Sequence, residues 1–170
     1  MQTGYKVIDI MTNKPVIASR DMSLKDAAQL MHKENINSLI IVENDIPMGI
    51  VTDEDFVRKC IAKGLDSKKL KIRDIISTDL LTISPDVDIS EALKMMTNHG
   101  IRQLPVVDEK KFVGFLTMKD ILKIQPDLID LVAEKYEIRE ESRKLRELEK
   151  MAEDDGSSFF SKLKLRKKRR

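Results

Sequence analysis

The segment Lys6–Met31, KVIDIMTNKPVIASRDMSLKDAAQLM, occurs again at Lys71–Met96 as KIRDIISTDLLTISPDVDISEALKMM. The match continues at the same shift of 65 positions, because NINSLIIVENDIPMGIVTDEDF at Asn35–Phe56 aligns without a gap with GIRQLPVVDEKKFVGFLTMKDI at Gly100–Ile121. A match that keeps apolar runs and polar turns in register indicates duplicated supersecondary units, not a chance likeness between two helices. The chain is therefore predicted to contain two copies of one small fold.

Each copy has the pattern of a β-α-β-β-α unit. A short apolar run, Val16–Ala18 or Leu81–Ile83, precedes a helix whose apolar residues recur at i, i+3, i+4 and i+7. Two strands joined by a polar turn follow, and a second helix begins at Thr52 or Thr117. One unit is too small to bury both faces of its sheet, so the two are expected to pack sheet against sheet. The expected strand pairs are Leu39–Val42 with Met48–Val51, and Leu104–Val107 with Phe112–Leu116.

The predicted class is α/β (α+β), with two repeats followed by a helix and a tail. We expect the repeats at residues 6–62 and 71–125, the helix at 127–153 and the tail at 156–170. Pro126 stands at a favoured helix start, and Leu131, Ile138 and Leu145 then recur every seven residues. This imperfect heptad favours a helix that docks on the repeats or on a partner, with a coiled coil as the alternative.

The charge of the chain is concentrated at its end. The segment Lys162–Arg170, KLKLRKKRR, has seven basic side chains, and without them the formal net charge of +2 becomes −5. Such asymmetry is typical of an appended segment. The tail is expected to be a disordered, solubilising segment, or else to bind an anionic membrane surface or nucleic acid through its Lys and Arg side chains.

Composition and motifs exclude several classes of function. No apolar run approaches the roughly 18 residues of a membrane span, and the first residues do not form a signal peptide. Cys60 is the single cysteine, so an internal disulfide is excluded and a cytoplasmic location is expected. His32 and His99 share no ligand spacing with it, so no metal site is predicted. Nucleophile-elbow, Walker-loop and zinc-protease motifs are missing from the sequence, so we expect no enzymatic activity and no required cofactor.

The string G-h-h-T-x-x-D (h, apolar) at Gly49–Asp55 and Gly114–Asp120 resembles the signature of the CBS (cystathionine β-synthase) domain. The sequences DIMT from Asp9 and IRQLPVVDE from Ile101 strengthen the resemblance, which covers roughly residues 6–125. It implies two repeats related by a pseudo-two-fold axis, two clefts between them, and a homodimer of such pairs. It also implies a stand-alone prokaryotic or archaeal protein that regulates a partner and binds AMP, ADP, ATP or an S-adenosyl compound. CBS pairs also occur inside IMP dehydrogenase-like enzymes, but no catalytic domain accompanies them here.

The same resemblance implies the residues of the two clefts. In each, the motif Asp would hold the ribose hydroxyls, the motif Thr would approach the phosphate, and the other repeat would frame the base. We name the clefts by their motifs. The second-motif cleft is expected to comprise Thr117, Lys119, Asp120, Arg102, Gln103, Met11, Val16 and Ile36. The first-motif cleft is expected to comprise Thr52, Asp55, Asn37, Ser38, Ile76, Leu81 and Ile101.

The chemistry of the motifs permits two interpretations. A carboxylate can accept two hydrogen bonds from a cis-diol, and a helix N-terminus favours an anion. The same Thr-x-x-Asp strings are also ordinary capping boxes, and one residue can serve both purposes. Arg102 and Lys119 lie near the second motif, whereas Asn37 and Glu54 hold the equivalent positions in the first. A phosphate is therefore expected to prefer the second-motif cleft, unless Arg58 or Lys59 reaches the first.

Two functions follow from these observations. The first is a regulatory module that senses an adenosine nucleotide and transmits the signal to an unknown partner. The second is a dimeric scaffold or interaction protein whose basic tail, Lys162–Arg170, binds nucleic acid or an anionic membrane.

Overall fold

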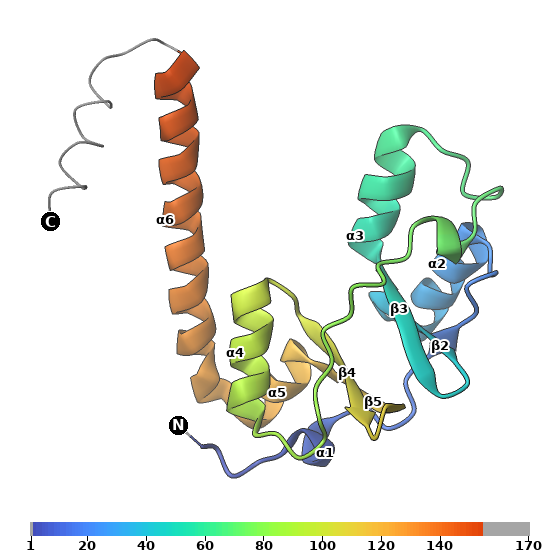
Figure 1. The fold of residues 1–170 in the computed structure, drawn as a ribbon, viewed down its shortest axis with the longest axis horizontal. Coiled ribbons are helices and arrows are strands. Elements are labelled where there is room, and N and C mark those ends of the chain that lie inside the picture. The colour runs from blue at the N-terminus through green and yellow to red at the C-terminus, as the bar shows by residue number, and fades with distance from the viewer. Residues whose placement is uncertain (1, 155–170) are drawn as a thin grey trace, which may run out of the picture. The chain divides into compact units, whose positions relative to one another are not determined.

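A computed structural model describes residues 2–154, and residues 1 and 155–170 lie outside that description. The chain divides into two units, Met1–Pro126 and Asp127–Arg170. Both repeats belong to the first unit (Figure 1). The mixed α/β class predicted from the sequence is confirmed by the order of helices and strands.

The first repeat forms a three-stranded sheet with helices around it. Its strands are β1 (Ile17–Ala18), β2 (Ser38–Glu43) and β3 (Ile46–Thr52), in the order β1-β2-β3. The pair β1 and β2 is parallel, and the hairpin β2 and β3 is antiparallel. Helix α2 (Leu24–Glu34) begins after Ser23, whose hydroxyl accepts a hydrogen bond from the Asp26 amide, as the sequence predicts.

The second helix of this repeat is irregular, which the sequence did not reveal. It begins as α3 (Asp53–Asp55), continues as a π-helix (Phe56–Cys60) and ends as a 3₁₀-helix (Ile61–Lys63). Gly64 then adopts a left-handed conformation, with φ of 64°, and its amide donates to the carbonyl of Ile61. This is the ordinary way to end a helix, because glycine meets no steric penalty there.

The second repeat contains α4 (Ile89–His99), β4 (Gln103–Asp108), β5 (Lys111–Thr117) and α5 (Met118–Ile124). The strand expected at Leu81–Ile83 was wrong in its extent, because only the single bridge Ile83–Val106 forms there. In the first repeat, Ile17 pairs with Ile40. The equivalent partner in β4 is Pro105, which has no amide hydrogen to donate to a parallel neighbour.

The segment that opens the first repeat lies on the second. It contains α1 (Val7–Ile10), and the Val7 amide donates to the Val87 carbonyl at 2.9 Å. Thr12 exchanges two backbone hydrogen bonds with Phe115 of β5, at 2.8 and 3.0 Å. Met11 therefore reaches the sheet of the second repeat, although it belongs to the first in sequence.

The segment that opens the second repeat lies, in the same way, on the first. It contains a 3₁₀-turn (Ile72–Asp74), and the Ile72 amide donates to the Met22 carbonyl at 2.9 Å. Ser77 exchanges two backbone hydrogen bonds with Ile50 of β3, each 2.9 Å long. The two repeats thus exchange their first segments, with equivalent contacts 65 positions apart.

Both faces of the central strands β2 and β4 are buried at their middle residues. In β2, Leu39 and Ile41 belong to the core that α2 covers, and both are fully buried. Ile40 points to the other face of the strand, as alternation requires, and is only 2% exposed. Its equivalent in β4, Pro105, is also buried.

The described part of the second unit is dominated by one long helix, α6 (Ile129–Asp154), which follows a 3₁₀-turn at Pro126–Leu128. The helix predicted at residues 127–153 is therefore present. Two of its apolar side chains, Ile138 and Leu145, are half exposed or more. Its docking on the repeats or a partner stays a prediction, and the tail at 156–170 lies outside the described residues. Within residues 2–154, no helix has the length and apolarity needed to cross a membrane.

Candidate functional site

The two Thr-x-x-Asp motifs build the same local structure. Thr117 ends β5 and caps α5: its amide and hydroxyl donate to Asp120 Oδ2 at 3.1 and 2.6 Å. The Asp120 amide donates back to Thr117 Oγ1 at 3.3 Å. At the end of β3, Thr52 and Asp55 make the same three bonds, at 2.9, 2.9 and 3.3 Å. The capping interpretation is confirmed for both motifs, and it uses one carboxylate oxygen of each Asp.

The other carboxylate oxygen distinguishes the two motifs. Asp55 Oδ1 lies 2.8 Å from the ammonium nitrogen of Lys59, one helical turn further on. Within the described part of the chain, Asp120 Oδ1 has no hydrogen bond or ion pair. Its two lone pairs are therefore available to an external donor.

The neighbours of the second motif carry positive charge. The Met118 amide donates to the Arg102 carbonyl at 2.8 Å, so the backbone of Arg102 lies at the start of α5. Gln103 pairs with Thr117 across the β4–β5 hairpin. The side chains of Arg102 and Lys119 are exposed, and neither makes an ion pair within residues 2–154.

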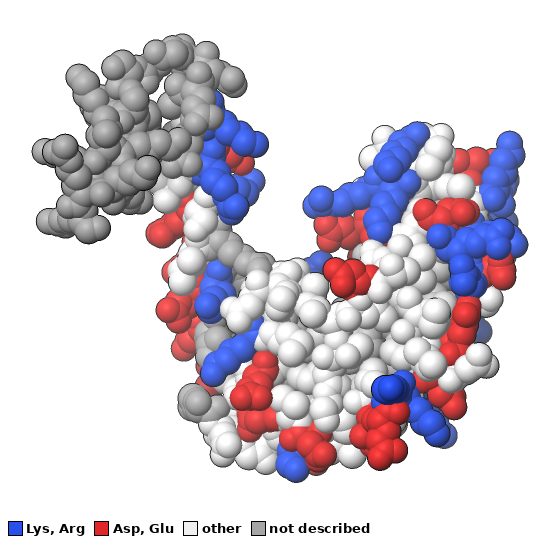
Figure 2. All heavy atoms as spheres, viewed as in Figure 1, with Lys and Arg blue, Asp and Glu red and all other residues white. Residues whose placement is uncertain are grey.

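The neighbours of the first motif carry mixed charge that is already paired. Asn37 Nδ2 donates to Asp53 Oδ2 at 2.9 Å, and the Asp53 amide donates to the Asn37 carbonyl at 3.0 Å. Arg58 is bound to Glu54, with a distance of 2.7 Å between nitrogen and oxygen. In Figure 2, acidic and basic side chains adjoin in several clusters around a mostly uncharged central area of this face. Arg58 and Lys59 both reach acidic groups of the first motif, which is the condition under which the expected charge contrast weakens. The preference of a phosphate for the second motif therefore stays a prediction.

The motif glycines allow the exchanged segments to approach the sheets. A Cβ at Gly49 would collide with the Ile76 side chain and would lie 2.9 Å from the Ser77 carbonyl oxygen. A Cβ at Gly114 would collide with the Met11 side chain. The structure thus brings Met11 to the strand that leads into the second motif, and Ile76 to the strand that leads into the first.

Ser38 and Gln103, which the sequence assigned to different clefts, meet in the structure. Ser38 Oγ donates to Gln103 Oε1 at 2.9 Å, joining β2 to β4. The two positions are 65 apart and therefore equivalent in the repeats. The pseudo-two-fold axis passes near this bond, which the repeat alignment could have indicated.

The remaining predicted residues are apolar and partly buried. Val16, Ile36 and Ile76 pack against the core of the first repeat. Leu81 and Ile101 are also partly buried, and the Ile101 amide donates to the Met96 carbonyl at the end of α4. Their role in framing a base stays a prediction.

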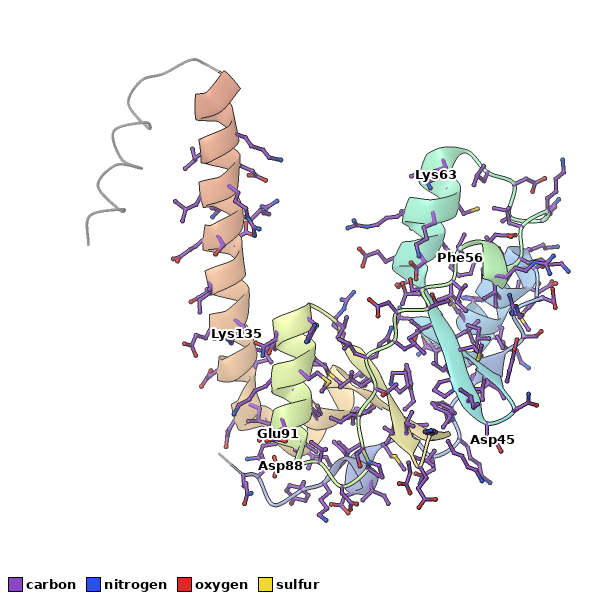
Figure 3. All side chains as sticks on the ribbon, in the orientation of Figure 1. Asp45, Phe56, Lys63, Asp88, Glu91 and Lys135 are labelled. Carbon is purple, nitrogen blue, oxygen red and sulfur yellow. The ribbon has the colours of Figure 1, made fainter. Side chains whose placement is uncertain are left out.

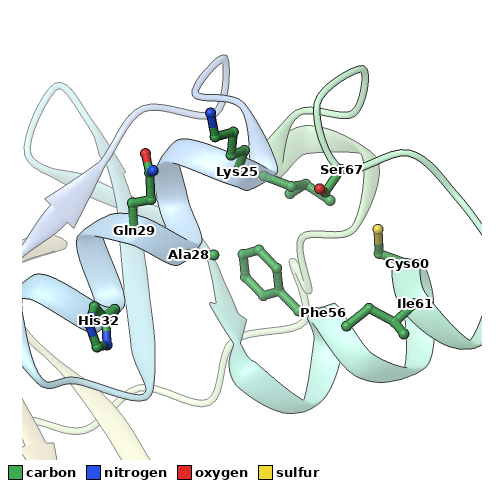
Figure 4. A pocket seen from close by; sticks show the side chains of 9 residues that line it. Lys25, Ala28, Gln29, His32, Phe56, Cys60, Ile61 and Ser67 are labelled. Carbon is green, nitrogen blue, oxygen red and sulfur yellow. The ribbon is translucent and has the colours of Figure 1, made fainter.

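An apolar groove that the sequence did not predict lies between α2 and the irregular helix (Figure 4). Its volume is about 410 Å³, and none of the predicted site residues lines it. Cys60, one of its lining residues, is buried, and its thiol donates to the Leu65 carbonyl at 3.4 Å. Ile61 at its rim is 69% exposed. The signal in the sequence was the run of apolar residues on the helix after Thr52. The lining residues are Leu24, Lys25, Ala28, Gln29, His32, Phe56, Cys60, Ile61 and Ser67.

The duplicated fold matches a known family. The family model of the CBS domain matches residues 7–62 and again 72–127. The chain belongs to the CBS-domain family. It therefore contains a CBS pair, in which the Thr-x-x-Asp motifs lie at the second helix of each domain.

Similar proteins extend the comparison. The chain is 36% identical to the uncharacterized protein MK0525 of Methanopyrus kandleri over 128 residues, which are 74% of this chain and 63% of that one. It is 30% identical to the CBS domain-containing protein YhcV of Bacillus subtilis, covering 68% of this chain and 81% of YhcV. Among solved structures, the CBS pair of protein MJ0100 in complex with 5'-methylthioadenosine and S-adenosyl-L-methionine has a TM-score of 0.64 and 30% identity. That match covers 71% of this chain and 94% of the other.

Proposed function

We propose that this CBS pair is a regulatory module, not an enzyme, and that it binds an adenosine-containing ligand at the second motif. The candidates are AMP, ADP, ATP and S-adenosyl compounds. The single observation that carries the proposal is the unused oxygen of Asp120, held in place by the capping box beside two unpaired cations, Arg102 and Lys119.

The geometry of Asp120 suits a ribose. Thr117 fixes one carboxylate oxygen with two hydrogen bonds, so the carboxylate does not rotate away when a ligand arrives. The free oxygen has two lone pairs and can accept from two neighbouring hydroxyls. A hydrogen bond to a charged group contributes about 1.5–3 kcal/mol. Such bonds to Asp120 would therefore favour ligands that carry a ribose.

Arg102 and Lys119 distinguish ligands with a phosphate from those without one. Each is exposed and makes no ion pair within residues 2–154, and each lies near the start of α5, so both could approach a phosphate at the second motif. A guanidinium can bind two phosphate oxygens at once, and Lys adds a point charge. We therefore expect AMP or ATP to bind more tightly than the uncharged adenosine.

The complex of the MJ0100 CBS pair supports the class of ligand. That protein binds 5'-methylthioadenosine and S-adenosyl-L-methionine, which share adenosine with the nucleotides proposed here. Its 30% identity to this chain makes an adenosine ligand the reasonable first candidate.

Signal transmission is part of the same proposal. A ligand shifts a conformational equilibrium only by its difference in affinity between the two states. The exchanged segments tie each domain to the other, so a change at Asp120 would reach Met11 through β5. We further propose that the chain forms a homodimer, since the groove next to Ile61 exposes apolar side chains. The cytoplasmic location proposed for it rests on the single cysteine, Cys60. Sedimentation velocity of the full chain tests the dimer.

The proposal is tested by calorimetric titration of the full chain with AMP, ATP, S-adenosylmethionine and adenosine. We expect saturable binding of at least one ligand, and tighter binding of AMP than of adenosine. Mass spectrometry of small molecules released from the purified protein tests it independently. If all four titrations show no binding and no adenosine compound co-purifies, the proposed function is wrong.

A further inference from the structure

Lys59 is held in place by three groups of the first repeat. Its ammonium nitrogen lies 2.8 Å from Asp55 Oδ1, 2.8 Å from the Ile75 carbonyl oxygen and 3.0 Å from Ser77 Oγ. An ammonium has three hydrogens to donate, so these partners saturate it. The side chains of Lys59 and Asp55 are 37% and 15% exposed, respectively. This arrangement is therefore a partly buried ion pair with a complete set of acceptors.

The oxygen that Lys59 occupies is the equivalent of the free oxygen in the second repeat. There, position 124, which corresponds to Lys59 at the shift of 65, is Ile124, whose side chain is 46% exposed. An isoleucine offers no donor to Asp120. The two motifs thus have the same capping box but differ at the second carboxylate oxygen. Lys59 occupies that oxygen in Asp55, whereas Ile124 leaves it free in Asp120.

We propose that Lys59 fills the ribose position of the first motif from within the protein, so that the CBS pair takes one adenosine ligand, at Asp120, and not two. The inference rests on the proposed function, in which the motif carboxylate binds the ribose. For a diol to reach Asp55 Oδ1, the ammonium must leave a carboxylate with which it forms a charge-assisted hydrogen bond. The departing ammonium would also give up its bonds to Ile75 and Ser77, which line the same place.

The test compares the number of ligand sites in variants of the full chain. Calorimetric titration with AMP, and in parallel with S-adenosylmethionine, is expected to give one site per chain for the unmodified protein. Lys59→Ile copies the second repeat and is expected to give two. Lys59→Gln serves as a second variant, because it removes the charge but can still donate to Ile75 and Ser77. Thermal melting of each variant shows whether the fold is retained.

Lys63 provides the matched control. It lies at the far end of the same helix (Figure 3), is exposed, and makes no hydrogen bond or ion pair with the residues that the structure describes. Lys63→Ile changes charge and hydrophobicity as Lys59→Ile does, and is expected to leave one site.

The second motif can be removed to locate the new site. Asp120→Asn is expected to leave no site of the unmodified protein's affinity, and Asp120→Asn combined with Lys59→Ile is expected to give one. Two sites in the unmodified protein, or one site in both folded Lys59 variants, would overturn the role of Lys59 and leave the proposed function intact. Loss of all binding in every protein, the unmodified chain included, would overturn the proposed function and this inference with it.

Discussion

Ser38 Oγ donates a hydrogen bond of 2.9 Å to Gln103 Oε1, and the two residues occupy the same position in the two CBS domains. Because a position can meet its own equivalent only at the pseudo-two-fold axis, this bond marks the centre of the pair. The bond also joins strand β2 of the first domain to strand β4 of the second. The bond is a direct side-chain contact between the two domains, in addition to the backbone contacts of the exchanged segments.

We expect Ser38 and Gln103 to be energetically coupled. Replacing either one by Ala leaves the other without its partner in a partly buried place, while replacing both leaves no unpaired group. A double-mutant cycle of Ser38→Ala and Gln103→Ala, measured by urea unfolding, should give an interaction energy of about 0.5–1.5 kcal/mol. If the changes in the free energy of unfolding caused by the two single substitutions sum to the change caused by the double substitution, the bond does not couple the domains.

The two motif carboxylates should respond differently to the same substitution. Asp120→Asn keeps an oxygen for the Thr117 cap but replaces the free acceptor by an amide group, so adenosine-ligand affinity should fall about tenfold to a hundredfold. Asp55→Asn should change affinity less than threefold, because Lys59 already occupies that carboxylate. Calorimetry on both variants checks this. Equal losses would show that both motifs bind the ligand.

Gly49 and Gly114 should also differ in their tolerance of a side chain. At Gly114 the obstacle is the flexible side chain of Met11, whereas at Gly49 it is Ile76 together with a backbone carbonyl at 2.9 Å. Gly49→Ala should therefore destabilise the fold by about 1–3 kcal/mol, and Gly114→Ala by less. Urea unfolding compares the two. A Gly114→Ala variant that is the less stable of the pair would contradict this packing account.

Asp88, the cap of α4, binds the start of the chain. Its carboxylate accepts hydrogen bonds from the amides of Ser90, Thr3 and Gly4 and from the Thr3 hydroxyl (Figure 3). Partial burial raises the pKa of Asp88, but the hydrogen bonds from Ser90 and Thr3 outweigh it and lower the pKa to about 2 from an ordinary 3.8. A depressed pKa means that the folded state prefers the charged carboxylate.

The stabilisation by Asp88 should accordingly be complete above pH 3.8 and be lost as the pH falls toward 2. Its size is on the order of 1 kcal/mol, once solvent screening near the surface is allowed for. Thr3→Ala removes one donor and should raise the pKa of Asp88, which NMR titration of the carboxyl carbon measures. An unchanged midpoint in Thr3→Ala would show that the N-terminal contact does not hold Asp88.

The fold was predictable from the sequence because its signals are local and occur twice. The helix periodicity after Ser23 and Asp88, and the polar turns of the two hairpins, gave the elements directly. The strand at Leu81–Ile83 was overestimated, because its partner includes Pro105, whose missing amide hydrogen matters only once the pairing register is known. The family resemblance implied the exchange of first segments, because it assigned Met11 to the second-motif cleft and Ile76 to the first-motif cleft. The repeat pattern alone does not show which copy a first segment contacts.

The local geometry of the two motifs was predictable from the sequence, whereas the partners of their second carboxylate oxygens were less so. The Thr-x-x-Asp strings predicted capping boxes, and both formed. The spacing of Asp55 and Lys59 is that of a helical ion pair, so their contact was within reach of the sequence. The two further acceptors of Lys59, Ile75 and Ser77, come from the exchanged segment and became visible only in three dimensions.

Because the repeats exchange their first segments, one repeat in the sequence is not the same stretch of chain as one domain in the structure. Cutting the chain between Gly64 and Leu70 would separate the two repeats. Each fragment would then keep the first segment that packs on the other fragment's sheet and would lack the first segment that packs on its own sheet. Two such fragments should bind each other, because each carries the segment that the other lacks. A single repeat could cover its sheet in the same way only by exchanging its first segment with a second chain. In the tandem chain this exchange is intramolecular, and equivalent positions can hold different residues, as Lys59 and Ile124 do.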